Sequence, residues 1–274
     1  MIESPQTMNH SVSNRKILGI ALAVCLVCSL IVATAAVTLK PLQTANQLAA
    51  RQRVLVELAG LNLPDSSIEA AYRQFDVYMV ELDSGETRQG LSAENFDLKQ
   101  ALRKEEWSSP LARTDDPANI RRKPKYLPVY QLRNRDGSLG TLILPVFGYG
   151  LWSTLYGFIA LDGDLRTVKG IRFYEHGETP GLGGEVDNLG WLARWRGKVV
   201  FDDNWQPRIE LVKGNVSDDM PDHQYKVDGL SGATMTTRGI NDLLKYWLGD
   251  TGFGPYLLRL RQQHSNKGGN NETS

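Results

Sequence analysis

The stretch DGLSGATMTTRG, residues 228–239, holds the residues whose types and spacing most clearly suggest chemistry. It places Ser231, Thr234, Thr236 and Thr237 close together, directly ahead of a pattern typical of a helix. A helix N-terminus has free N–H groups and a positive dipole potential, so it favours phosphate, and Ser or Thr beside it can cap the helix or bind that phosphate. The residues alone leave several interpretations open: helix capping, a bound phosphate, a phosphorylated residue, or a residue with a covalently tethered group.

EHGETPGLGGEV, residues 175–186, is a second stretch that suggests a site. Its four glycines and one proline predict a loop with close backbone approach. His176 and Glu178 could form an acid/base pair or bind a metal. One histidine without a second histidine nearby is weak evidence for a metal site. The loop could instead lay its amides along a planar ligand, or simply join a strand to a helix. We therefore assign neither a metal site nor a catalytic residue.

A third glycine cluster, Gly148-Tyr149-Gly150 with Gly157, does not predict a dinucleotide site. Its spacing does not match GxGxxG, and the segment leads into a β-like run instead of a helix. A Rossmann fold is therefore excluded, and any NADH site must lie on another chain.

Residues 17–39 contain no charged side chain and predict a transmembrane helix. As a helix they span ~35 Å, enough to cross a hydrocarbon core of ~30 Å. A cleaved signal peptide would have a shorter apolar core, although Ala35-Ala36 could imitate its cleavage site. Arg15 and Lys16 favour a cytoplasmic N-terminus, with the bulk of the chain on the other side of the membrane.

Composition narrows the remaining classes of function. The chain has 31 Lys plus Arg and 31 Asp plus Glu, so general electrostatic binding of nucleic acid is not expected. Both cysteines, Cys25 and Cys28, lie in the apolar segment. The rest of the chain therefore has no disulfide and no thiol nucleophile.

The order of the predicted elements indicates an α+β fold. Two hairpins are expected around Asp136-Gly137 and Asp162-Gly163. A short helix is expected at 189–196, and two further strands at 198–201 and 207–214. An apolar stripe with helical spacing then predicts a helix packed on the sheet, with buried Ile240, Leu243, Leu244, Trp247 and Leu248.

Five segments are expected along the chain. They are a cytoplasmic N-terminus at 1–16, a transmembrane helix at 17–39, a juxtamembrane helix with a small mixed subdomain at 40–128, a second domain at 129–261, and a disordered polar tail at 262–274.

The motifs together resemble a known family. DGLSGAT is similar to the flavinylation motif of covalent FMN proteins, and HGETPGLG resembles the loop found upstream of it in the same FMN-binding domain. LKPLQTANQLAARQRVLVELAGL and LPVFGYGLWSTLYGFIAL narrow the resemblance to the C-subunit family of sodium-translocating NADH:quinone reductases (Nqr). It extends from the apolar segment to about Arg261, and implies that 129–261 is a mixed α/β extracytoplasmic FMN-binding domain built on antiparallel hairpins.

The resemblance implies which residues hold the cofactor. Thr234 matches the threonine to which a flavin transferase joins FMN through its phosphate, one per chain. If that assignment fails, Thr236 is the alternative. The family's stretch that the flavin transferase recognises corresponds to Asp228, Ser231, Gly232 and Ala233 of this chain. The family's loop near the flavin corresponds to His176, Glu178, Thr179, Gly181, Leu182 and Gly183.

The resemblance also implies a function. It is that of an electron-transfer subunit of a bacterial inner-membrane complex that passes electrons from NADH to ubiquinone and exports sodium, with the FMN domain on the periplasmic side. The other subunits and the flavin transferase would be its partners. An alternative is the FMN subunit of the related ferredoxin:NAD electron-transport (Rnf) complex, which shares SGAT and TPGLG. A non-enzymatic membrane-anchored module is the alternative from another class.

Overall fold

The computed structural model describes residues 14–61, 68–91, 93 and 96–269. The chain separates into two compact units, Met1–Ala50 and Arg51–Ser274, which are described separately below. The predicted cytoplasmic segment 1–16 lies almost wholly outside the described residues.

The first unit is the N-terminal part of helix α1 (Asn14–Leu58). Among the described residues, α1 alone is long and apolar enough to cross a membrane, and its most apolar window is fully exposed. This fits a single-pass anchor and agrees with the predicted span at 17–39. The helix continues through Pro41, so the expected anchor and juxtamembrane helices form one element.

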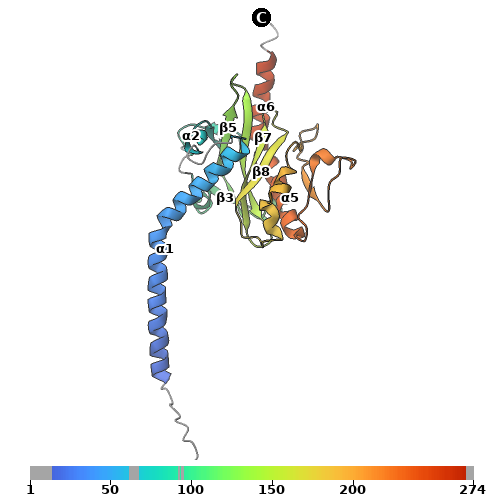
Figure 1. Ribbon diagram of the computed structural model, residues 1–274. Helices are drawn as coiled ribbons and strands as arrows, with labels where there is room; N and C mark the ends of the chain where they lie inside the picture. Colours follow the sequence, from blue (N-terminus) through green and yellow to red (C-terminus); the bar gives the residue numbers. More distant parts are fainter. Residues whose placement is uncertain (1–13, 62–67, 92, 94–95, 270–274) are drawn as a thin grey trace, which may run out of the picture. The chain divides into compact units, whose positions relative to one another are not determined.

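The second unit is built on a six-stranded antiparallel sheet with the order β2-β1-β5-β6-β7-β8. Three of these strands, β5, β7 and β8, are labelled in Figure 1. Its strands are β1 (Asp76–Glu81), β2 (Thr87–Arg88), β5 (Tyr126–Arg133), β6 (Leu139–Tyr149), β7 (Thr154–Asp162) and β8 (Val168–Glu175).

Consecutive strands β5 to β8 pair as hairpins, which confirms the two predicted turns. β1 pairs along its whole length with β5, from Asp76 opposite Gln131 to Glu81 opposite Tyr126. The expected boundary between 40–128 and 129–261 is therefore wrong. The sequence of β1, DVYMVE, shows no clear alternation of apolar and polar residues, and only its backbone pairing with β5 places it inside the main sheet.

The central strands alternate between two cores, one on each face of the sheet. On β6, Ile143 belongs to one core, while Leu142 and Leu144 belong to the other. This is the period-two pattern of a strand buried on both sides. Helix α5 (Thr234–Leu248) contributes to the core of Leu142, and the end of α1 with α2 (Ile68–Tyr72) contributes to the core of Ile143.

The remaining elements are short, apart from the last helix. They are α3 (Leu98–Ala101), α4 (Leu189–Ala193) and α6 (Gly254–Gly269), the two-stranded sheets of β3 (Ser108–Pro110) with β4 (Arg122–Pro124) and β9 (Glu210–Val212) with β10 (Lys226–Asp228), and the 3₁₀ turns η2 (Arg113–Asp115), η3 (Gly183–Asp187) and η4 (His223–Tyr225).

Three local predictions are corrected by these elements. Residues 198–201 are not a strand, because Val199 and Phe201 form only isolated bridges. The strand expected at 207–214 is reduced to β9. The disordered tail expected at 262–274 is wrong for 262–269, which continue α6, while 270–274 lie outside the described residues. Arg and Gln at 261–263 are good helix formers, so a helix anchored by its first turns can extend through them.

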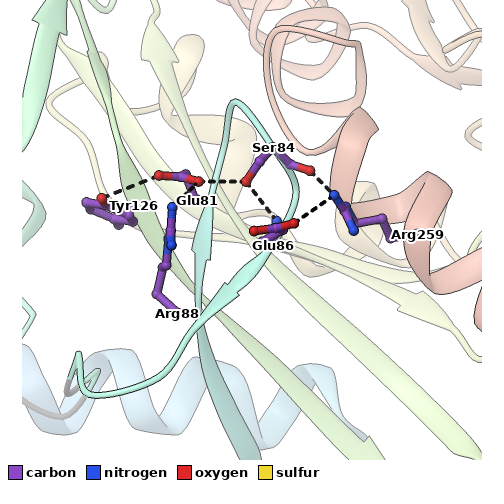
Figure 2. Close-up of polar contacts among 6 residues, drawn as sticks. All are labelled: Glu81, Ser84, Glu86, Arg88, Tyr126 and Arg259. Carbon is purple, nitrogen blue, oxygen red and sulfur yellow. Dashed lines mark hydrogen bonds and ion pairs between the residues drawn. The ribbon is translucent and has the colours of Figure 1, made fainter.

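Helix α6 contacts the edge hairpin of β1 and β2 through a hydrogen bond and an ion pair (Figure 2). Arg259 donates from Nε to the carbonyl oxygen of Ser84 at 2.9 Å and pairs with Glu86 at 3.0 Å. Gly85 at the hairpin tip has φ +69°, and a Cβ there would lie 2.4 Å from the carbonyl carbon of Pro255. Only glycine allows this approach of hairpin to helix.

Candidate functional site

Helix α5 lies against β6, and two glycines allow the close approach. A Cβ on Gly148 would lie 2.7 Å from Cβ of Leu243, and one on Gly239 would lie 2.3 Å from the carbonyl oxygen of Tyr149. At the other end of the contact, Trp247 donates from Nε1 to the carbonyl oxygen of Phe147 at 2.6 Å. These contacts fix the start of α5 beside the turn that follows β6.

The start of α5 is open to solvent. Its N-cap is Ala233, which provides no side-chain hydrogen bond, and Gly232 before it has φ +71°. The first helical residue is Thr234, whose side chain is exposed. The first N–H groups of a helix have no intrahelical acceptor, so they offer donors and positive potential next to the Thr234 hydroxyl.

The hydroxyl residues of this stretch have different surroundings. Thr236 is only 1% exposed and donates from Oγ1 to Glu178 Oε2 at 2.6 Å. The Thr237 hydroxyl accepts from the N–H of Leu230 at 3.0 Å. Ser231 and Thr234 are exposed. Because the N-cap is an alanine, helix capping does not explain why so many hydroxyls are present.

The Glu178 side chain makes hydrogen bonds to both the turn after β6 and the first turn of α5. The residue is 5% exposed, and its carboxylate accepts N–H bonds from Leu151, Trp152 and Ser153, at 3.1, 2.9 and 3.2 Å to Oε1. Burial acts to raise the pKa of this carboxyl, but the Thr236 hydroxyl and the backbone N–H groups outweigh it, so the pKa lies below its ordinary value. Glu178 is thus a buried anion that joins three segments.

His176 makes contacts separate from the Glu178 carboxylate. Its Nδ1 accepts from the N–H of Glu178 at 3.2 Å, and its Nε2 lies 2.9 Å from Asp187 Oδ2. This geometry assigns the proton to Nε2, which donates to Asp187. The two side chains do not form the acid/base pair considered from the sequence. Among the described residues, no cluster of three or more His, Cys, Asp or Glu could hold a metal.

The glycines of the loop allow it to pack against the Glu178 carboxylate. A Cβ on Gly183 would lie 2.5 Å from Thr236 Oγ1 and 2.7 Å from Glu178 Oε2. Gly181 has φ +76° and lies in an exposed turn, where the carbonyl oxygen of Thr179 accepts from the N–H of Leu182 at 3.1 Å. The loop is therefore built around the Glu178–Thr236 contact, which the sequence pattern did not predict.

Asp228 contacts a different part of the fold. It is 6% exposed, accepts from the N–H of Val216 at 2.9 Å and forms an ion pair with Arg194. Its carbonyl oxygen accepts from Trp191 Nε1 at 2.8 Å. Asp228 thus ties α4 and the loop before η4 to the strand that leads into the start of α5.

Exposed apolar side chains occur on the three segments that Glu178 joins. They are Leu151 and Trp152 on the turn after β6, 41% and 65% exposed, Leu182 on the glycine loop, 45%, and Met235 on the first turn of α5, 48%. A Cβ on Gly232 would lie 3.0 Å from Leu182 Cδ2, so this leucine lies beside the start of α5. We call these four side chains the apolar rim. Only Leu182 was expected at the site from the sequence.

Comparison with known proteins identifies the family. Residues 150–249, which include the apolar rim and α5, match the FMN-binding domain family. The C subunit of the Na(+)-translocating NADH-quinone reductase of Pseudomonas aeruginosa is 45% identical over 259 residues, covering 93% of this chain and 99% of the relative. The chain belongs to that C-subunit family. The Yersinia pestis member is 43% identical over 251 residues, covering 90% of this chain and 93% of its own.

Solved structures of the family share the fold. The crystal structure of Shewanella oneidensis NqrC has a TM-score of 0.73 and 32% identity, covering 80% of this chain and 99% of its own. The corresponding protein from Parabacteroides distasonis has a TM-score of 0.62 and 26% identity, covering 80% and 96%. The expected α+β class with antiparallel hairpins is confirmed.

FMN is the cofactor of this family, and the described residues fit it. The start of α5 offers an exposed Thr234 hydroxyl and, as at any helix N-terminus, N–H groups without an intrahelical acceptor, which suit a phosphate. The apolar rim offers exposed carbon surface suited to an aromatic ring system.

Proposed function

We propose that this chain carries FMN esterified through its phosphate to Thr234, as the electron-transfer subunit of a membrane NADH:ubiquinone oxidoreductase that exports sodium. The observation that best supports the attachment point is the exposure of Thr234 at the open start of α5. Thr236, the sequence-based alternative, is buried and hydrogen-bonded to Glu178.

The chain's own residues would bind and orient the cofactor. A phosphodiester at Thr234 keeps one negative charge, which the N–H groups and dipole of α5 stabilise. Leu151, Trp152, Leu182 and Met235 would contact the isoalloxazine ring. FMN supplies one- and two-electron chemistry when bound, and the protein tunes it through burial and hydrogen bonds. An electron relay needs no general acid or base, which agrees with His176 and Glu178 being engaged with protein groups.

The covalent bond would suit a subunit that passes electrons between neighbours, because it prevents loss of the carrier. We propose that the NADH site lies on another subunit, that sodium coupling belongs to the whole complex, and that a flavin transferase attaches FMN during maturation. The apolar part of α1 would anchor the chain in the bacterial inner membrane. Arg15 and Lys16 favour a cytoplasmic N-terminus, and on this basis we propose that the FMN domain lies in the periplasm.

The alternative, the FMN subunit of the Rnf complex, is disfavoured by the relatives. Several members of the C-subunit family match along more than nine-tenths of their own length, including the segments that flank the FMN-binding domain.

The test is intact-mass and peptide-mass analysis of the full chain produced together with a flavin transferase. We expect a gain of one FMN less one water on the peptide that contains Thr234, and its loss in Thr234→Ala without loss of the fold. A yellow protein with unmodified peptides would disprove the ester, and a colourless, unmodified protein beside a modified control protein would disprove the carrier function.

A further inference from the structure

The Glu178 carboxylate binds one of the three threonine hydroxyls in the first turn of α5. Thr236 Oγ1 donates to it at 2.6 Å, a bond between residues 58 positions apart in the sequence. Thr234 has no corresponding acceptor among the bonds of the described residues, and its side chain is exposed. The two threonines therefore differ in a property that an attacking hydroxyl needs, which is access to the incoming phosphorus.

The surroundings of Glu178 make this contact rigid. Three consecutive N–H groups, of Leu151, Trp152 and Ser153, hold the carboxylate from the turn after β6. Gly183 packs so closely that a Cβ there would lie 2.5 Å from Thr236 Oγ1. Hydrogen bonds to a charged group are stronger than neutral ones, and a buried anion cannot give them up to water.

We propose that Glu178 is a positioning residue that prevents FMN attachment at Thr236 by sequestering its hydroxyl, so that Thr234 and not Thr236 is the flavin acceptor. This proposal rests on the proposed function, since it assumes that FMN is attached to the first turn of α5. The role differs from binding FMN, because Glu178 acts through Thr236 and through the turn at 151–153.

The attachment step defines what the hydroxyl must do. A phosphodiester requires an activated flavin phosphate, for which the chemical class is a flavin dinucleotide. A bond forms from threonine Oγ to the flavin-side phosphorus, the pyrophosphate P–O bond breaks, a nucleoside monophosphate leaves, and the hydroxyl proton passes to a base on the transferase. A hydroxyl that already donates to a buried carboxylate, behind a packed glycine loop, cannot approach that phosphorus.

The decisive experiment asks whether releasing Thr236 makes it an acceptor. Thr234→Ala removes the normal acceptor and should leave the chain unmodified when it is produced with the transferase. Adding Glu178→Ala, or the milder Glu178→Gln, frees the Thr236 hydroxyl and should give FMN on the peptide at Thr236. Loss of one hydrogen bond to a charged group shifts a local equilibrium about tenfold or more, so we expect at least that increase in FMN at Thr236 over Thr234→Ala alone.

This result is a gain of modification, which simple destabilisation would not produce. Adding Thr236→Val to the double variant is the matched control and should abolish the new signal. Circular dichroism and thermal unfolding identify the folded variants, and Glu178→Gln serves if Glu178→Ala does not fold. Folded double variants that stay unmodified at Thr236 would overturn the proposal.

The wild-type chain separates this failure from failure of the proposed function. FMN on Thr234 in the wild type, with no gain at Thr236 in the double variants, rejects only the role of Glu178. A wild-type chain with no covalent FMN rejects the proposed function itself, and FMN on Thr236 in the wild type rejects both.

Discussion

Gly239 on α5 lies against the end of β6, with a Cβ at this position reaching within 2.3 Å of the carbonyl oxygen of Tyr149 and 3.1 Å of Gly150 Cα. The two backbones are in contact at the point where the strand turns into the segment held by Glu178. Thr234 lies on the same helix, five residues before Gly239. The backbone contact at Gly239 therefore sets the position of Thr234 relative to the turn after β6.

Gly239→Ala should destabilise the second unit, although alanine is the better helix former by about 1 kcal/mol. The clash is with backbone atoms, so the helix itself must shift, which costs about 1–3 kcal/mol or more. Gly190→Ala is a matched control on α4, where the nearest atom to a Cβ is a side-chain oxygen of Asn188 at 3.2 Å. Urea unfolding should give a lower midpoint for Gly239→Ala only, and equal midpoints would contradict the packing described.

The stabilisation from Glu178 should depend on pH in a defined direction. Its pKa is lowered in the folded state, so its contribution is fully present above the unfolded pKa and is lost as the pH falls through the folded pKa. Glu178→Gln should therefore lower the free energy of unfolding at neutral pH by about 1–3 kcal/mol. The difference from wild type should shrink below the ordinary glutamate pKa of 4.5.

Thermal unfolding of both proteins between neutral and acid pH measures this difference. His176 and Asp187, which contact each other beside Glu178, are unchanged in the variant, so the difference between the two proteins reports on the Glu178 carboxylate. A difference that stayed constant or grew toward acid pH would show that Glu178 is not stabilised as an anion.

Asp228 should affect FMN attachment in two ways: it stabilises the fold, and it belongs to the motif that the transferase recognises. Its carboxylate pairs with Arg194 and accepts from the N–H of Val216. Arg194→Met leaves the motif intact but removes the cation from a mostly buried carboxylate. Breaking such a pair from one side costs up to about 3–5 kcal/mol when it is fully buried, and less here because Arg194 is half exposed.

We expect Arg194→Met to lower both the melting temperature and the fraction of chains carrying FMN, in parallel with Asp228→Asn. Asp228→Asn keeps an oxygen that can accept from Val216, so its loss of stability should be the smaller. If Arg194→Met were destabilised yet fully modified, Asp228 would act only as part of the sequence that the transferase reads.

Particular residues show what the sequence could and could not predict. The stripe of Ile240, Leu243, Leu244, Trp247 and Leu248 predicted α5 because a helix on a sheet repeats its apolar positions, and all five are buried. The hairpins were predictable for the same reason, since turn residues interrupt an alternating pattern.

Nothing local in the sequence links Glu178 to Thr236, because their contact depends on how β6, the glycine loop and α5 come together. The strand β1 was missed because its pairing with β5 joins residues about fifty positions apart. Leu151 and Trp152 also carried no local signal, since an exposed apolar side chain is informative only when its neighbours in space are known.

Trp152→Ala should change the environment of the attached flavin without changing stability. The side chain is 65% exposed, so its loss should alter the free energy of unfolding by no more than about 0.5 kcal/mol. An aromatic side chain beside a flavin quenches its fluorescence, so emission of the attached FMN should rise in Trp152→Ala. Leu258→Ala, an exposed apolar change on α6, is the matched control and should leave emission unchanged. Unchanged emission in a fully modified Trp152→Ala protein would place the flavin ring away from the turn after β6, and would remove the apolar rim from the proposed cofactor contacts.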